Sequence, residues 1–147
     1  MEAFCNYGCR FCYAPLTEQR KESRISKEAG ISLIQDLANS GVKKINFVGV
    51  EPMLHPHLEA WIVAAKSCGL TTSIVSNGTR MTEEWLTRMR PHLDWLGLSV
   101  DASNDEMHAL MGRGLKGGIA SGAPSVLLYT SDPAHGSSGG QPGGSPS

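Results

Sequence analysis

The sequence has little excess charge of either sign and no long apolar run. Its 13 lysines and arginines nearly balance its 14 aspartates and glutamates, so it offers no broad basic surface for nucleic acid or for an anionic membrane. The longest apolar runs, such as AWIVAA at 60–65, are far shorter than the roughly 20 residues of a membrane span. The first four residues lack the basic and apolar regions of a signal peptide. We therefore expect a cytoplasmic protein that binds neither nucleic acid nor a membrane.

Cysteine is also scarce, and three of the four cysteines lie in the short stretch CNYGCRFCYAP, residues 5–15: Cys5, Cys9 and Cys12. Thiols in the cytoplasm stay reduced, which favours metal ligands or free thiols over disulfides. A structural zinc site needs four ligands, usually in two separated pairs, and His55 with His57 could complete one. Three clustered thiolates also suit a [4Fe–4S] cluster in which one iron lacks a protein ligand. A cofactor with an amine and a carboxylate could chelate that iron.

Helix and strand patterns alternate between Cys5 and about Gly114. Helices are expected after Ser26, near 58–68, after Thr82 and after Ser103, where Glu106 would complete a capping box. Strands rich in apolar or β-branched residues are expected at 43–49, 70–78 and 94–101. This alternation predicts an α/β fold with a parallel sheet, in which ligands bind at the carboxyl ends of the strands. The tryptophans are expected in the core: Trp61, Trp85 and Trp95.

The composition changes near residue 114. From there to the last residue, glycine, serine and proline dominate, with too little apolar material to offset the entropy of ordering. We expect an ordered core over 1–114 and a disordered Gly/Ser/Pro-rich tail over 115–147. A truncated or mis-spliced gene product would explain so abrupt a change.

Polar motifs follow the predicted strands in a recognisable order. Gly49–Pro52, Ser76–Gly78 and Ser99–Asp101 each follow a strand, behind a Cys-x3-Cys-x2-Cys spacing. This set resembles the radical S-adenosylmethionine (radical SAM) superfamily, with Gly49–Pro52 similar to its Gly-Gly-Glu-Pro motif. Within this superfamily, the chain resembles in particular the viperin-like nucleotide synthases of the microbial branch. Four stretches carry this resemblance: CNYGCRFC, KKINFVGVEP, SIVSNG and LGLSVDASNDEMHALMGRG.

The resemblance implies a partial (βα) radical SAM barrel, a parallel sheet with outer helices and about four of the usual six strands. The family's first strand runs directly into the first cysteine. One departure from the pattern is Val50, which replaces the second glycine of the motif. If this position needs a positive φ or a close approach to the cofactor, valine would strain it by about 1–3 kcal/mol.

The resemblance also implies the site residues. Three thiolates, those of Cys5, Cys9 and Cys12, would hold a [4Fe–4S] cluster. Lys44 and Asn46 would bind a nucleoside triphosphate, and their spacing places both on one face of a strand. Contacts to S-adenosylmethionine would come from eight residues: Phe11, Gly49, Val50, Glu51, Asn77, Ser99, Asp101 and Arg113.

The reaction that the resemblance implies begins with an external electron donor. Cleavage of S-adenosylmethionine gives a 5′-deoxyadenosyl radical, which removes the ribose C4′ hydrogen of a CTP-like nucleotide. Loss of water then gives a 3′-deoxy-3′,4′-didehydro nucleotide, a terminator of viral polymerases and hence an antiviral product. Two alternatives remain open: a truncated, non-catalytic fragment that at most binds the cluster, and another radical SAM enzyme, such as a peptide-modifying one.

Overall fold

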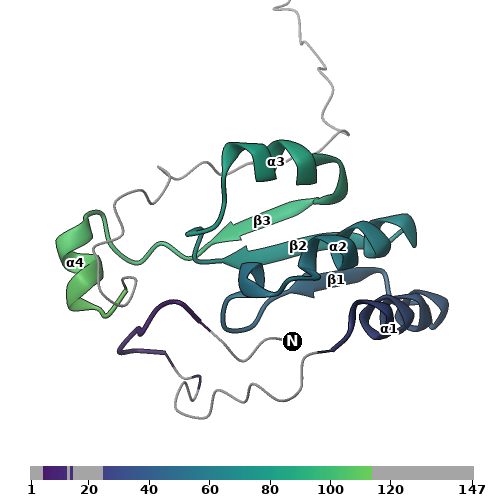
Figure 1. The fold of residues 1–147 in the computed structure, drawn as a ribbon, viewed down its shortest axis with the longest axis horizontal. Helices are drawn as coiled ribbons and strands as arrows, with labels where there is room; N and C mark the ends of the chain where they lie inside the picture. Colours follow the sequence, from purple (N-terminus) through teal and green to yellow (C-terminus); the bar gives the residue numbers. More distant parts are fainter. Residues whose placement is uncertain (1–4, 13, 15–24, 114–147) are drawn as a thin grey trace, which may run out of the picture.

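The computed structural model describes residues 5–12, 14 and 25–113, which form a three-stranded parallel sheet with helices (Figure 1). The strands lie in the order β1 (Lys44–Phe47), β2 (Thr71–Ser76) and β3 (Trp95–Leu98). The other elements are α1 (Lys27–Asn39), η2 (Pro52–Leu54), α2 (Leu58–Ser67), α3 (Glu83–Met89), η3 (Arg90–His92) and α4 (Asp105–Leu110). The predicted partial α/β barrel is thus confirmed. A strand leading into Cys5 and a tail over 115–147 fall outside the described residues and stay predictions.

One face of the sheet packs against α1, α2 and α3 and forms the core. Alternate strand residues point to this face, so that Phe47 of β1 and Ile74 of β2 lie opposite each other and are buried. Apolar residues of the helices complete the core: Ile34, Leu58, Trp61, Ile62, Ala65, Trp85 and Met89. The predicted core positions of Trp61 and Trp85 are therefore confirmed.

No helix among the described residues covers the other face of the sheet, called the uncovered face below (Figure 1), and this makes one core prediction wrong. Trp95 opens β3 opposite Ser73, and its side chain is 53% exposed. Its spacing along the strand fits a buried position, but Trp95 points to the face that lacks helices. Lys44 and Asn46 are also exposed on this side of β1.

Side-chain caps begin three of the α-helices. The Ser26 hydroxyl accepts a hydrogen bond from the Ala29 amide (3.1 Å), and the Thr82 hydroxyl accepts one from the Trp85 amide (3.2 Å), both as the sequence predicts. The predicted Ser103 cap of α4 is wrong by one residue. Asn104 has the extended backbone of an N-cap residue, and its Oδ1 accepts from the Met107 amide at 2.9 Å.

Candidate functional site

Glu51 joins the carboxyl ends of β1 and β2. The residue is 2% exposed, and its carboxylate accepts three hydrogen bonds. Oε1 accepts from the Ser76 hydroxyl (2.8 Å) and from the Met53 amide (3.0 Å), while Oε2 accepts from the Asn77 amide (2.8 Å). A buried carboxylate is stable only when such donors compensate its lost hydration. These contacts place two predicted site residues, Glu51 and Asn77, side by side.

Asn77 connects this strand end to the cysteine loop, residues 5–12. Its Nδ2 donates to the Asn6 Oδ1 at 2.8 Å and lies 4.0 Å from the Cys5 Sγ. Asn6 in turn donates to the Thr79 hydroxyl at 2.7 Å. The structure therefore brings the first cysteine, Asn77 and Glu51 into one polar network. Asn6 and Thr79 are members that the sequence analysis missed, although both lie directly beside predicted motifs.

The three cysteines of the loop are free thiols, with Cys5 and Cys9 half-buried and Cys12 exposed. Burial raises the pKa of the Cys5 thiol, although the hydrogen bond from the Tyr7 amide to its Sγ (3.4 Å) acts in the opposite direction. Burial also raises the pKa of Cys9, against the lowering effect of the Arg113 cation. Deprotonation of these thiols is therefore expected to accompany metal binding rather than to precede it.

The donor set fits an iron–sulfur cluster by its chemistry. Three thiols on one short loop, one of them with an amide directed at its sulfur, are typical soft ligands for iron–sulfur clusters. Within the described residues, no three histidine, cysteine, aspartate or glutamate side chains are already gathered around one point. Neither the three cysteines alone nor the cysteines with His55 and His57 are therefore already gathered around a single metal ion in this part of the chain.

Arg113 connects the cysteine loop to the segment that follows β3. It is 5% exposed, and its guanidinium pairs with the Asp101 carboxylate and donates to the Ser99 carbonyl. The guanidinium carbon also lies 5.3 Å from the centre of the Tyr7 ring, within the range of a cation–π contact. Three predicted residues thus form one cluster, Ser99, Asp101 and Arg113, together with Tyr7.

The remaining cofactor residues lie in the loop and in the β1–η2 connection. Phe11 is 57% exposed at the end of the cysteine loop. Gly49 has a φ of +146°, a region that favours glycine. Val50 is half-buried beside it, and the expected strain at Val50 stays a prediction.

Lys44 and Asn46 lie on the uncovered face of the sheet, as their spacing predicts. The Asn46 Oδ1 accepts from the Ser73 hydroxyl at 2.9 Å, and the Lys44 Nζ lies 6.0 Å from the centre of the Trp95 ring. Both contacts reach across neighbouring strands. Ser73 and Trp95 were missed as members of this polar face because the sequence does not show which strands are neighbours.

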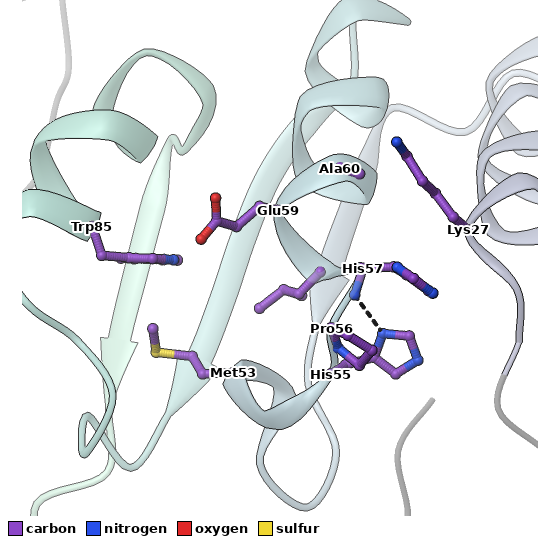
Figure 2. Close-up of a pocket in the computed structure, with 9 residues that line it drawn as sticks. Lys27, Met53, His55, Pro56, His57, Glu59, Ala60 and Trp85 are labelled. Carbon is purple, nitrogen blue, oxygen red and sulfur yellow. Dashed lines mark hydrogen bonds between the residues drawn. The ribbon is translucent and has the colours of Figure 1, made fainter.

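A groove of about 560 Å³ opens elsewhere, on the helix-covered side of the sheet (Figure 2). It lies among the start of α1, η2, the start of α2 and α3, and its lining includes Lys27, His55, Glu59 and Trp85. Of the candidate residues named from the sequence, only His55 and His57 of the alternative zinc site line it. The candidate site is therefore the network at the carboxyl ends of the strands and not this groove. No helix among the described residues is long and apolar enough to cross a membrane.

Comparisons with known proteins identify the family of the chain. The profile of the Radical SAM superfamily matches residues 3–116. An S-adenosylmethionine-dependent nucleotide dehydratase of Flammeovirga pacifica is 34% identical over 113 residues, which cover 74% of this chain and 39% of that protein. The Fe-coproporphyrin III synthase of Methanosarcina barkeri is 33% identical over 117 residues, which cover 77% of this chain and 28% of that protein. The chain thus spans well under half the length of these curated relatives.

A solved structure confirms the fold. The structure of native anSMEcpe with bound AdoMet has a TM-score of 0.62 and 23% sequence identity, over 75% of this chain and 32% of that chain.

Proposed function

Because the chain belongs to the radical SAM superfamily, we propose that it acts as a viperin-like nucleotide dehydratase on a CTP-like nucleoside triphosphate. When bound, a [4Fe–4S] cluster and S-adenosylmethionine would supply a 5′-deoxyadenosyl radical that removes the ribose C4′ hydrogen. Loss of the 3′-hydroxyl as water from the nucleotide radical would then take up one proton and one further electron, which an external electron donor would supply. The observation that supports this most is the buried Glu51 carboxylate, which lies in one hydrogen-bonded network with Asn77 and Cys5.

In this proposal, three thiolates hold the cluster: Cys5, Cys9 and Cys12. Glu51 receives the amino group of the cofactor. A carboxylate offers about four acceptor positions. Three of those of Glu51 accept hydrogen bonds from the chain, so one position is left for a donor of the cofactor. Phe11, Gly49 and Val50 would line the cofactor on one side, as their motif positions suggest.

Ser99, Asp101 and Arg113 are proposed to contact the rest of the cofactor, with Arg113 facing its carboxylate. The Nε of Arg113 is buried and has no hydrogen-bond partner among the described residues. A buried N–H without a partner costs about 1–3 kcal/mol. A carboxylate placed there would relieve this cost, which supports the assignment.

Lys44 and Asn46 are proposed to bind the triphosphate on the uncovered face of the sheet. The Lys44 ammonium is a suitable partner for phosphate, and it is exposed on the face that a barrel would enclose. The Oδ1 of Asn46 accepts from the Ser73 hydroxyl. The Nδ2 of Asn46 takes no part in this bond and is proposed to donate to the triphosphate. An external electron donor would reduce the cluster.

Anaerobic reconstitution tests this function. The full chain is incubated with iron, sulfide, dithionite, S-adenosylmethionine and each nucleoside triphosphate in turn. We expect 5′-deoxyadenosine together with a nucleotide that has lost water. Lys44→Ala should raise the KM for the nucleotide by about tenfold, the value of one charge-assisted contact, with cluster content unchanged. Lys43→Ala is the matched control, since Lys43 is exposed and precedes β1 with the opposite side-chain direction.

A second candidate follows from the length of the chain. Since it spans 39% of the dehydratase it matches, it could bind the cluster without completing the reaction. Cluster formation without 5′-deoxyadenosine would favour this candidate. Formation of 5′-deoxyadenosine only when a peptide is present would instead favour a peptide-modifying radical SAM enzyme.

A further inference from the structure

The end of α4 is bonded to the cysteine loop through the backbone. The Gly8 amide donates to the Gly112 carbonyl (3.1 Å), and the Arg10 amide donates to the Met111 carbonyl (2.9 Å). These two bonds lie on either side of Cys9. Figure 1 shows the cysteine loop, in purple, next to α4 at one end of the molecule. The conformation of the loop around Cys9 is therefore set by residues about a hundred positions later in the chain.

The close approach of the two segments requires glycine at position 112. Gly112 has a φ of +74°, which residues with a side chain rarely adopt. A Cβ atom at this position would also overlap the carbonyl oxygen of Gly8 and would lie 3.4 Å from the Cγ of Arg10. Any side chain at residue 112 would thus push the end of α4 away from the loop.

Arg113 holds the same loop through a side chain. Its guanidinium lies over the ring of Tyr7. Tyr7 is buried, and it lies between Cys5 and Cys9 in the sequence. The ion pair with Asp101 and the bond to the Ser99 carbonyl fix the guanidinium to the segment that follows β3. Backbone and side-chain contacts therefore act together on residues 7–10.

We propose that Met111, Gly112 and Arg113 form a latch that holds residues 7–10 in the conformation that the cysteines need for metal binding. The identity of the bound group as a cluster rests on the proposed function. A loop that must be ordered when it binds a cluster loses conformational entropy at that step. The latch orders the loop before the cluster binds, and such preorganisation raises the affinity of the loop for the cluster. Arg113 acts here as a positioning residue for the loop, in addition to its proposed contact with the cofactor.

Amide hydrogen exchange tests the latch in the full chain before any metal is added. The Gly8 and Arg10 amides should exchange slowly in the wild-type chain, and at least tenfold faster in Gly112→Ala, relative to the amide of the core residue Ile62. Gly69→Ala is the matched control. Gly69 has nearly the same φ (+76°) and likewise follows a helix, but nothing lies within 4 Å of an added Cβ. Both variants therefore introduce the same backbone strain, and only Gly112→Ala introduces the overlap with Gly8.

The second readout is iron content after anaerobic reconstitution. Gly112→Ala should bind less than half of the iron of Gly69→Ala. Arg113→Ala should also speed the exchange of the Gly8 and Arg10 amides, and Arg113→Lys should restore part of the protection because it keeps a cation over Tyr7. The Arg113 pair tests the latch even if Gly112→Ala does not fold.

Equal exchange at these amides in Gly112→Ala and Gly69→Ala, or fast exchange already in the wild-type chain, would overturn the latch. A wild-type chain that keeps the exchange contrast but binds no iron would show that these residues hold the loop, and would contradict both the metal-binding role of the latch and the proposed function. Equal iron content in the two glycine variants despite the exchange contrast would contradict the metal-binding role alone. The two failures are thus distinguishable.

Discussion

At the scale of single residues, Glu51 carries the connection between two strands. Its carboxylate accepts from Ser76, Asn77 and Met53 in a buried position. Glu51→Gln replaces one acceptor oxygen by an NH2 group that faces donors. We expect the free energy of unfolding to fall by about 1–3 kcal/mol, the cost of buried donors left without acceptors.

Urea denaturation of the metal-free chain at pH 7 measures this loss. Glu106→Gln is the control, because Glu106 is exposed, and such a substitution should change the free energy of unfolding by less than about 0.5 kcal/mol. Equal effects of the two substitutions would contradict the role assigned to Glu51.

At the scale of secondary-structure elements, Asp94 ties the start of β3 to β2 and α2. Its carboxylate accepts from the Lys66 ammonium (2.6 Å) and from the Thr72 amide (2.8 Å). Burial pushes the pKa of Asp94 upward, but the hydrogen bonds from Lys66 and Thr72 outweigh it and leave the pKa below its usual value. The folded state therefore favours the charged form of Asp94.

The resulting stabilisation depends on pH. A lowered pKa means that the stabilisation is present above the unfolded pKa of about 3.9 and is lost as the pH falls through the lower, folded value. Asp94→Asn should lower the free energy of unfolding by about 1 kcal/mol at pH 7, a modest value because the pair is partly exposed to solvent. The difference from the wild-type chain in urea denaturation should shrink below pH 4. Asp36→Asn, at an exposed position, is the control, and it should change the free energy of unfolding at pH 7 by less than about 0.5 kcal/mol.

The N-cap of α4 offers a test at the same scale. Asn104→Ala removes the acceptor of the Met107 amide and should lower the free energy of unfolding by about 1 kcal/mol. Ser103→Ala should have almost no effect, because Ser103 is exposed and its neighbour caps the helix. Thermal unfolding of both variants followed by circular dichroism would decide between them, and a larger effect at Ser103 would support the capping box instead.

At the scale of the whole molecule, local patterns predict the order of the elements but not their neighbours. The Ser26 and Thr82 caps depend on residues three positions apart, and the parallel sheet follows from alternating periodicities. Trp95 shows the limit of predicting burial from the sequence. The spacing along the strand predicts which residues share a face with Trp95, but not whether helices cover that face. The contacts of Gly8 with Gly112 and of Tyr7 with Arg113 join distant segments, so a single sequence gives no signal for them.

The whole-molecule account requires that Cys5, Cys9 and Cys12 hold a cluster with one iron open to S-adenosylmethionine. The most direct test is the electron paramagnetic resonance spectrum of the reconstituted, dithionite-reduced chain with and without S-adenosylmethionine. The account predicts a [4Fe–4S]⁺ signal whose g values shift when S-adenosylmethionine is added, and which Cys9→Ser abolishes. A colourless protein that binds about one zinc ion, or a cluster signal that S-adenosylmethionine leaves unchanged, would contradict it.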